Sequence, residues 1–175
     1  MHAKDSVVIR VWLGRRFRQA VRWVLGFHGR PTEVARGIAI GVFVAFTPSL
    51  GLQMATAAVL ATMTYSNRPA AMGSVWVSNP FTALPIYMLT YRVGRFLVGT
   101  GPVDIRHRLL TVVVDDEGSW FNLTHQVREL VSLGSDVLIP LTVGGAILGL
   151  LAAMVTYVLT HSIITWAKRR FHLGR

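Results

Sequence analysis

The chain of 175 residues contains no cysteine, which excludes disulfide bonds, thiolate metal ligands and a cysteine nucleophile. Acidic residues are scarce: eight Asp and Glu stand against 18 Lys and Arg, for a formal net charge of +10. The six histidines lack the spacing of metal ligands, so we expect no metal and no cofactor. No glycine-rich phosphate loop, nucleophile elbow or carboxylate pair lies in an apolar segment, so we expect no enzyme.

Charge is missing altogether from three long segments. Residues 37–67, 69–91 and 137–167 contain no Asp, Glu, Lys or Arg. Each segment exceeds the roughly 20 residues that a helix needs to cross the hydrocarbon core of a bilayer. Charged residues make up 15% of the chain, against about 25% in ordinary soluble domains. The sequence therefore predicts one all-α integral membrane domain over residues 1–175.

The charges that are present predict an orientation. Basic residues gather in residues 1–36 and 168–175, whereas acidic residues predominate in residues 101–136. Because cytoplasmic segments carry an excess of Lys and Arg, we expect both termini to be cytoplasmic and the loop 101–136 to be external. The basic residues flank apolar segments and form no recognition module, so we expect no nucleic-acid partner.

Two of the apolar segments contain a proline-centred break, and these breaks determine the expected architecture. The breaks are centred on Pro48, with Gly51 close behind it, and on Pro80. A first segment that crossed once would put the basic tail outside, whereas a re-entrant hairpin returns the tail to the inside. We therefore predict an amphipathic cytoplasmic-face helix in residues 1–30, a broken or re-entrant hairpin over 31–65, a discontinuous helix over 70–98, a polar loop over 101–136, a transmembrane helix over 137–167 and a basic tail over 168–175.

The amphipathic segment has two interpretations. Its arginine-rich face lies opposite an aromatic and aliphatic face over residues 12–27. Such a helix can lie on an anionic membrane surface, or its apolar face can pack onto the protein's own spans.

Small residues recur at four-residue spacing in two of the predicted helices. This spacing places them on one helix face and lets another backbone approach closely. The two faces are candidates to pack against each other, within one chain or between chains. They consist of Gly37, Gly41 and Ala45, and of Gly145, Gly149 and Ala153.

The breaks also predict a ligand site. A helix that restarts after each proline exposes N–H groups near Leu50–Met54 and Phe81–Leu84, and such groups attract anions. Polar and basic side chains lie close by in sequence, and an ionisable residue within a span is a functional-site hypothesis. We therefore expect an anionic headgroup, such as a lipid phosphate, to bind among Gln53, Ser78, Asn79, Thr82, Arg92 and Arg95.

Each of these residues also has a purely structural interpretation. Asn79 is suited to cap the helix that follows Pro80. Gln53 is suited to bind the backbone that the first break frees. Arg92 and Arg95 are suited to extend toward lipid headgroups at the membrane surface.

The order of these signals resembles a known family. The shared pattern comprises Pro31, Ala35-x-Gly37-x-Ala39-x-Gly41-Val42-Phe43, Pro48-x-x-Gly51-x-Gln53, Asn67-Arg68, Asn79-Pro80-x-Thr82, and Tyr87 with Tyr91-x-x-Gly94. Over about residues 25–100 the chain resembles the prokaryotic membrane protein family called domain of unknown function 2062. The resemblance implies a small polytopic protein of the bacterial inner membrane and no established activity. In some relatives the module is joined to sugar-transferring domains, which implies a glycosyltransferase-type partner.

These observations lead to one functional expectation and two alternatives. We expect a protein that binds or transports an anionic lipid or a lipid-linked glycan carrier in envelope biogenesis. The alternatives are a scaffold that holds a partner enzyme through residues 1–30, and a small ion channel with the breaks as its filter. Because so few spans shield polar breaks poorly, we also expect a homo-oligomer.

Overall fold

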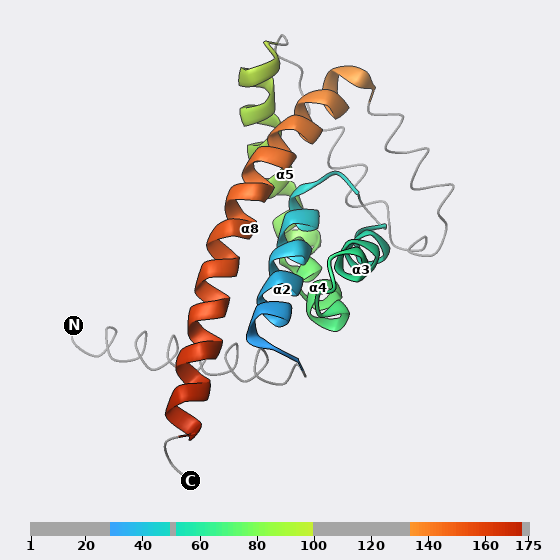
Figure 1. The fold of residues 1–175 in the computed structure, drawn as a ribbon. Helices are drawn as coiled ribbons and strands as arrows, with labels where there is room; N and C mark the ends of the chain where they lie inside the picture. The colour runs from blue at the N-terminus through green and yellow to red at the C-terminus, as the bar shows by residue number, and fades with distance from the viewer. Residues whose placement is uncertain (1–28, 50–51, 100–133, 173–175) are drawn as a thin grey trace, which may run out of the picture.

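The computed structural model describes residues 29–49, 52–99 and 134–172. Every regular element in these ranges is a helix, as the sequence predicts (Figure 1). The elements are α2 (Pro31–Phe46), α3 (Gln53–Met63), α4 (Arg68–Ser74), the 3-10 turn η1 (Val75–Val77), α5 (Pro80–Val98) and α8 (Ser135–His172). The amphipathic segment 1–30 and the loop 101–136 lie almost wholly outside the described residues, and so does Gly51.

Helices α2 and α3 form a hairpin, and the chain that follows α3 returns to the first turn of α2. Pro31 begins α2, where its missing N–H leaves no hydrogen bond unmade. The helix ends at Phe46, and Thr47 has extended backbone, as favoured for a residue that precedes proline. After α3 the chain returns, and the Asn67 N–H donates to the Glu33 carbonyl oxygen at 3.0 Å. The α2–α3 hairpin occupies the range 31–65 in which the sequence predicts a broken or re-entrant hairpin.

A second group of helical segments, α4, η1 and α5, follows directly after the hairpin. The Asn67 side chain caps α4 by accepting a hydrogen bond from the Ala70 N–H at 2.9 Å. Helix α4 continues into η1, the chain breaks at Ser78–Asn79, and α5 begins at Pro80. The expected discontinuous helix over 70–98 is thus two helices joined by a 3-10 turn. By contrast, Pro85 and Pro140 lie inside α5 and α8 without ending them.

The small residues of α2 pack against α4. A Cβ atom on Gly37 would overlap the carbonyl oxygen of Asn67, and one on Gly41 would overlap that of Ala71. Ala45, on the next turn, is completely buried. These positions need small residues because the α4 backbone occupies the space where longer side chains would lie.

Two adjacent glycines of α8 contact two different helices. A Cβ atom on Gly144 would overlap the Thr90 carbonyl oxygen in α5, whereas one on Gly145 would overlap the Phe46 carbonyl oxygen at the end of α2.

One turn further along α8, Gly149 also faces the end of α2, and a Cβ atom on it would lie 3.1 Å from the Phe43 carbonyl oxygen. Ala153 is half-buried. Within this chain the two small-residue faces therefore meet other partners than each other, although Gly145 and Gly149 do contact the end of α2. The face of α2 meets α4 instead, because the α4 backbone already fills the space beside Gly37 and Gly41.

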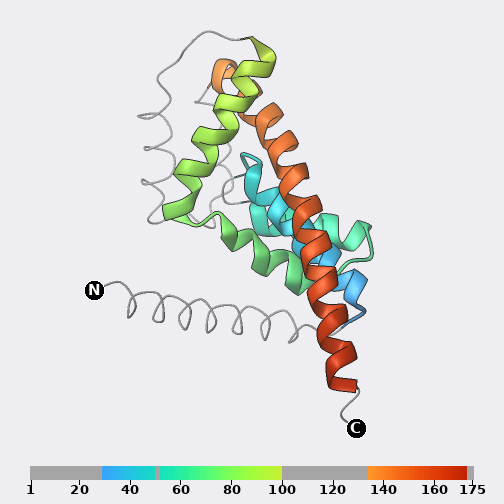
Figure 2. The same cartoon turned by 90° about the vertical axis from the view of Figure 1, so that its left-hand side faces the viewer.

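Helix α8 connects the two ends of the fold. Near its start it runs alongside α5 (Figure 2). There Val137 and Leu141 join a buried cluster with Ala83, Tyr87 and Tyr91. Near its other end, Ile164 packs with residues of α2 and α4 at the base of the hairpin.

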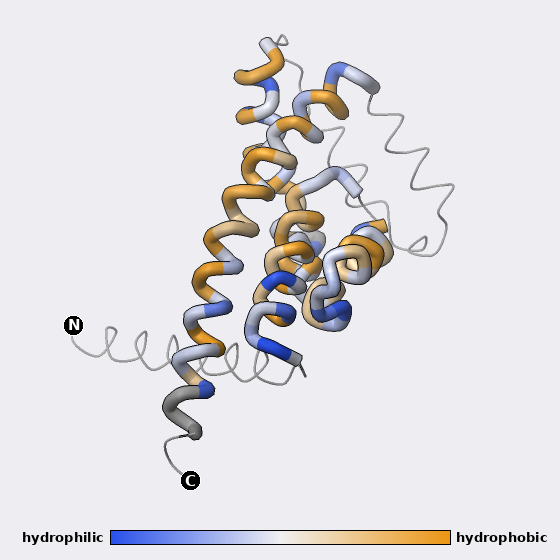
Figure 3. Tube along the Cα trace, in the orientation of Figure 1, coloured by the Kyte–Doolittle hydropathy of each residue, from blue (hydrophilic) through white to orange (hydrophobic). Residues whose placement is uncertain are grey.

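The length and composition of α8 set it apart from the other described helices. Its segment Ser135–Lys168 is, among the described helices, the one long and apolar enough to cross a membrane. Figure 3 shows apolar residues along most of its length. Many of them are exposed, among them Leu150, Leu151, Met154, Val155, Val158 and Leu159. An apolar surface of this extent is typical of a helix in contact with lipid or with another protein.

Candidate functional site

A series of hydrogen bonds connects the two breaks between helices. The Ser78 hydroxyl donates to Gln53 Oε1 at 2.8 Å, and Gln53 Nε2 donates to the Tyr87 hydroxyl oxygen at 3.1 Å. The Tyr87 hydroxyl in turn donates to the Thr47 carbonyl oxygen at 3.4 Å. We call Thr47, Gln53, Ser78 and Tyr87 the break network. It joins the end of α2, the start of α3, the end of η1 and the middle of α5.

The break network adds hydrogen bonds to carbonyl groups at the end of α2. Pro48 has no N–H to donate to the Val44 carbonyl oxygen, which instead accepts from the Thr47 N–H at 3.0 Å and from the Thr47 hydroxyl at 2.8 Å. The Thr47 carbonyl oxygen accepts from Tyr87, and Gln53 positions that hydroxyl. Gln53 and Tyr87 are themselves buried. The Gln53 side chain bonds to two hydroxyl groups, and it reaches the backbone at the first break only through the Tyr87 hydroxyl.

Asn79 and Thr82 cap the start of α5. Asn79 Oδ1 accepts hydrogen bonds from the N–H groups of Phe81 and Thr82, both at 3.0 Å. The Thr82 hydroxyl oxygen accepts from the Asn79 N–H at 2.9 Å, which completes a reciprocal capping box. The Ala83 N–H is bonded to the Asn79 carbonyl oxygen. The expectation that N–H groups near Phe81–Leu84 are open to an anion is therefore wrong, because Asn79 already occupies them.

The start of α3 at the first break is built differently. Helix α3 begins at Gln53 without a side-chain cap, and the Leu52 N–H donates to the Ser49 carbonyl oxygen at 3.0 Å. Pro48 is half-buried. The expected anion-binding N–H groups near Leu50–Met54 lie partly outside the described residues.

Arg92 and Arg95 lie further along α5 than the break network. Five residues separate Tyr87 from Arg92, which is about 7.5 Å along a helix axis. Arg92 is exposed and Arg95 half-buried, and neither has a hydrogen bond or ion pair with any described residue. The structure thus joins Gln53 to Ser78, places Asn79 and Thr82 in the adjoining cap, and leaves the two arginines apart.

Apolar side chains surround the arginines on the outward face of α5. Phe81 is 90% exposed and Phe96 is 86% exposed, and Leu89 between them is also exposed. Residues at these spacings share the face on which Arg92 lies. A basic residue within an exposed apolar face is suited to contact the phosphates of a lipid surface.

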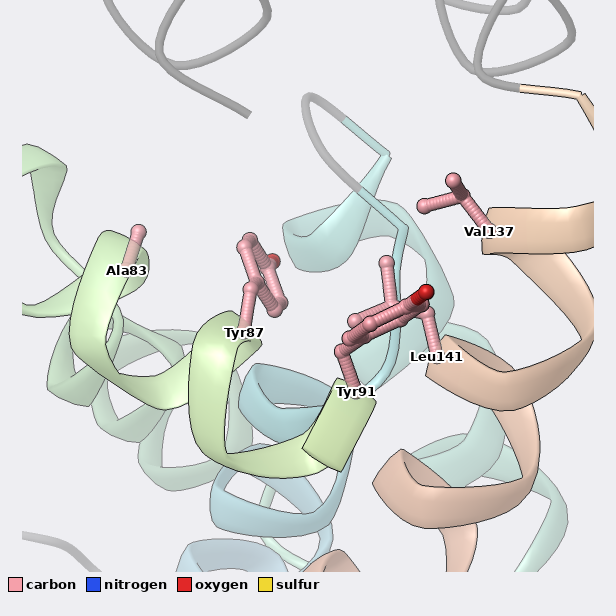
Figure 4. Close-up of a cluster of buried hydrophobic side chains, with 5 residues drawn as sticks. All are labelled: Ala83, Tyr87, Tyr91, Val137 and Leu141. Atoms are coloured by element: carbon pink, nitrogen blue, oxygen red, sulfur yellow. The ribbon is translucent and has the colours of Figure 1, made fainter. Parts of the chain in front are cut away.

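Tyr91 carries a buried hydroxyl group for which the described residues supply no hydrogen-bond partner. The residue is 2% exposed and lies one helical turn after Tyr87, in the same cluster (Figure 4). Leaving such a group unpaired costs about 1–3 kcal/mol. Sequence reasoning found Tyr87 and Tyr91 only as parts of a family pattern and missed them as site residues. Two tyrosines four residues apart in an uncharged segment are the signal that could have identified both.

Comparison with known proteins assigns the family. The family model described as "Uncharacterized protein conserved in bacteria (DUF2062)" matches residues 14–172, well beyond the 25–100 over which the motifs suggest the resemblance. Comparisons with curated proteins and with solved structures gave no match. The match includes both breaks, α5 and the whole of α8. The chain belongs to this bacterial family.

Proposed function

We propose that the protein is a multi-pass protein of the bacterial inner membrane that binds an anionic lipid. In this arrangement α8 crosses the bilayer. The α2–α3 hairpin enters from the cytoplasmic side and returns, and α4, η1 and α5 together make a second crossing. The proposal places the N- and C-termini on the same, cytoplasmic side.

The contacts at the two ends of the fold support this topology. The start of α2, the Asn67 turn and the Ile164 end of α8 lie together, since Val34, Ile38, Ala70 and Ile164 form one buried cluster. At the opposite end, the α5 backbone at Gly94 meets α8 at Pro140. The start of α2, the Asn67 turn and the end of α8, which the proposed topology puts on the cytoplasmic side, therefore lie at one end of the fold.

The depth of the break network is consistent with a membrane setting. The Phe46 carbonyl oxygen lies against Gly145, which is about 15 Å along α8 from its first residue at 1.5 Å per residue. In hydrocarbon, every unsatisfied backbone group costs several kcal/mol. A network that pairs the groups at both breaks is what such a position requires.

The observation that carries the proposed ligand is the arginine pair of α5. Arg92 lies on an exposed apolar face, and neither Arg92 nor Arg95 has an acidic partner in the described part of the chain. A guanidinium group in this setting is stabilised by a phosphate, to which it donates charge-assisted hydrogen bonds. The phosphate of a membrane lipid or of a lipid-linked glycan carrier has this chemistry.

The alternatives have less support. The polar side chains of the breaks bond to one another, which leaves them unavailable as the filter of an ion channel. The scaffold hypothesis depends on residues 1–30. We retain the homo-oligomer as a proposal, because the apolar surface of α8 is large enough to accommodate a second copy as well as lipid.

Native mass spectrometry of the detergent-extracted protein tests the proposal. The protein is titrated with phosphatidylglycerol and, separately, with zwitterionic phosphatidylcholine. We expect the wild type to retain phosphatidylglycerol preferentially and the double variant Arg92→Gln with Arg95→Gln to lose that preference. The same spectra report the number of subunits.

A matched control removes the same charge elsewhere. Arg36 and Arg68 are also exposed, at the hairpin end of the fold. The double variant Arg36→Gln with Arg68→Gln is expected to keep the preference. If the control loses the preference and the α5 variant keeps it, the lipid is bound elsewhere and the proposal is wrong.

A further inference from the structure

We propose that the Tyr91 hydroxyl is a second donor to the bound lipid phosphate, and that it forms one site with Arg95. This inference rests on the proposed function, and it assigns a residue that the arginine pair alone does not identify. The ligand class is a phosphate diester in a lipid headgroup.

The first observation is the contrast between two tyrosines one turn apart. Both side chains belong to the buried cluster formed with Ala83, Val137 and Leu141. The Tyr87 hydroxyl bonds to Gln53 and to the Thr47 carbonyl oxygen, whereas the Tyr91 hydroxyl has no partner in the described structure. Buried hydroxyl groups in native proteins nearly always have a partner, so an unpaired one calls for an explanation. A ligand that supplies an acceptor is such an explanation.

The second observation is the position of Arg95 relative to Tyr91. Residues four apart on an α-helix lie on the same face, and long side chains extend toward the preceding turn. Arg95 therefore belongs to the helix face of Tyr91, and it is half-buried and without an ion pair among the described residues. Figure 4 shows the Tyr91 hydroxyl directed toward α8, near Leu141.

The two groups have complementary chemistry for one anion. A phosphate diester offers two non-bridging oxygens, which accept hydrogen bonds from a guanidinium group and from a phenol hydroxyl. Arg92, which is exposed, supplies attraction from the outward side. In the structure the Tyr91 hydroxyl is enclosed. Arg95 and Leu138, on α5 and α8, are half-buried, and binding requires a movement of side chains that gives the phosphate access to the hydroxyl.

The variants Tyr91→Phe and Tyr87→Phe form a matched pair for the test. Each variant removes one hydroxyl group from the same cluster. Only Tyr87→Phe also removes hydrogen bonds that the described structure contains. Thermal unfolding is measured in detergent without lipid, with phosphatidylglycerol, with phosphatidylcholine and with inorganic phosphate. Lipid affinity is measured in parallel by native mass spectrometry.

The two variants should behave in opposite ways. Without lipid, Tyr91→Phe should unfold at the wild-type temperature or above it, and Tyr87→Phe should unfold below it. With phosphatidylglycerol, Tyr91→Phe should bind about tenfold more weakly, the loss expected for one hydrogen bond to a charged group. Tyr87→Phe should show the wild-type stabilisation by lipid.

Three outcomes would overturn the inference. If Tyr91→Phe bound phosphatidylglycerol with the affinity of the wild type, the inference would be wrong. The arginine variants would still test the proposed function separately. A lowered unfolding temperature of lipid-free Tyr91→Phe would mean that the hydroxyl has a partner within the protein. Equal stabilisation of the wild type by inorganic phosphate, with loss in Tyr91→Phe, would assign the site to free phosphate instead of lipid.

Discussion

The hydroxyl group of Tyr87 in α5 donates to the carbonyl oxygen of Thr47 at the end of α2, at a distance of 3.4 Å and across 40 positions of sequence. The same hydroxyl bonds to Gln53, which bonds in turn to Ser78, so the contact belongs to the series of hydrogen bonds that links the two breaks. Gln53, the first residue of α3, donates a hydrogen bond to the same hydroxyl oxygen. These contacts fix the end of α2 and the start of α3, where the chain leaves regular helix, to the middle of α5.

Replacement of Gln53 by Leu should destabilise the fold by about 2 kcal/mol. The change removes the two hydrogen bonds that the Gln53 amide makes with the Ser78 and Tyr87 hydroxyls, and each such bond contributes about 0.5–1.5 kcal/mol. The two hydroxyls keep their hydrogen bonds to the Val75 and Thr47 carbonyl oxygens. Thermal or denaturant-induced unfolding in detergent measures the effect. The neighbouring variant Met54→Leu is the control, since Met54 is exposed and should change stability by less than about 0.5 kcal/mol. Equal stability of the two variants would argue against the break network as a stabilising element.

Replacement of Gly144 by Leu should separate α5 from α8. A Cβ atom at this position overlaps the Thr90 carbonyl oxygen, and backbone on both sides cannot yield as a side chain can. Overpacking of this kind costs about 1–3 kcal/mol, and occasionally more.

The nearby variant Ala146→Leu is the control for Gly144→Leu, because Ala146 is exposed on the same helix. Both proteins are compared by thermal unfolding in detergent. We expect a clear loss in Gly144→Leu and little change in Ala146→Leu. A similar loss in both would mean that bulk anywhere on this part of α8 is harmful.

The absence of cysteine makes the proposed topology directly measurable. Single cysteines are introduced by Thr64→Cys, at the hairpin end, and by Ser135→Cys, at the start of α8; both residues are exposed. A membrane-impermeant maleimide should label the Ser135 position from the periplasmic side and the Thr64 position only in inverted vesicles. Labelling of both positions from one side would refute the arrangement of spans.

Features that neighbouring residues determine were predictable from the sequence. Pro48 and Pro80 both coincide with breaks, because proline lacks an N–H and restricts the residue before it. Asn79 precedes Pro80 and caps α5, as its short polar side chain favours. These features depend on a few neighbouring residues, so a single sequence contains the information for them.

Long-range contacts could not be assigned in the same way. Four-residue spacing identifies Gly37 and Gly41 as positions of close approach, but it carries no information on which helix approaches. The same limit applies to Gln53 and Arg92, which the breaks suggest as parts of one site. Their separation depends on where the start of α3 lies along α5, and no local pattern encodes that position.

The consecutive glycines of α8 have a mechanical consequence. Adjacent residues of an α-helix point in directions about 100° apart, so Gly144 and Gly145 seat α8 against two neighbours at once. Turning the helix about its long axis would drive backbone into α5 or into the end of α2, whichever way it turned. Helix α8 can therefore shift only if α5 and the hairpin shift with it, and these three parts should respond to any force as a single rigid body.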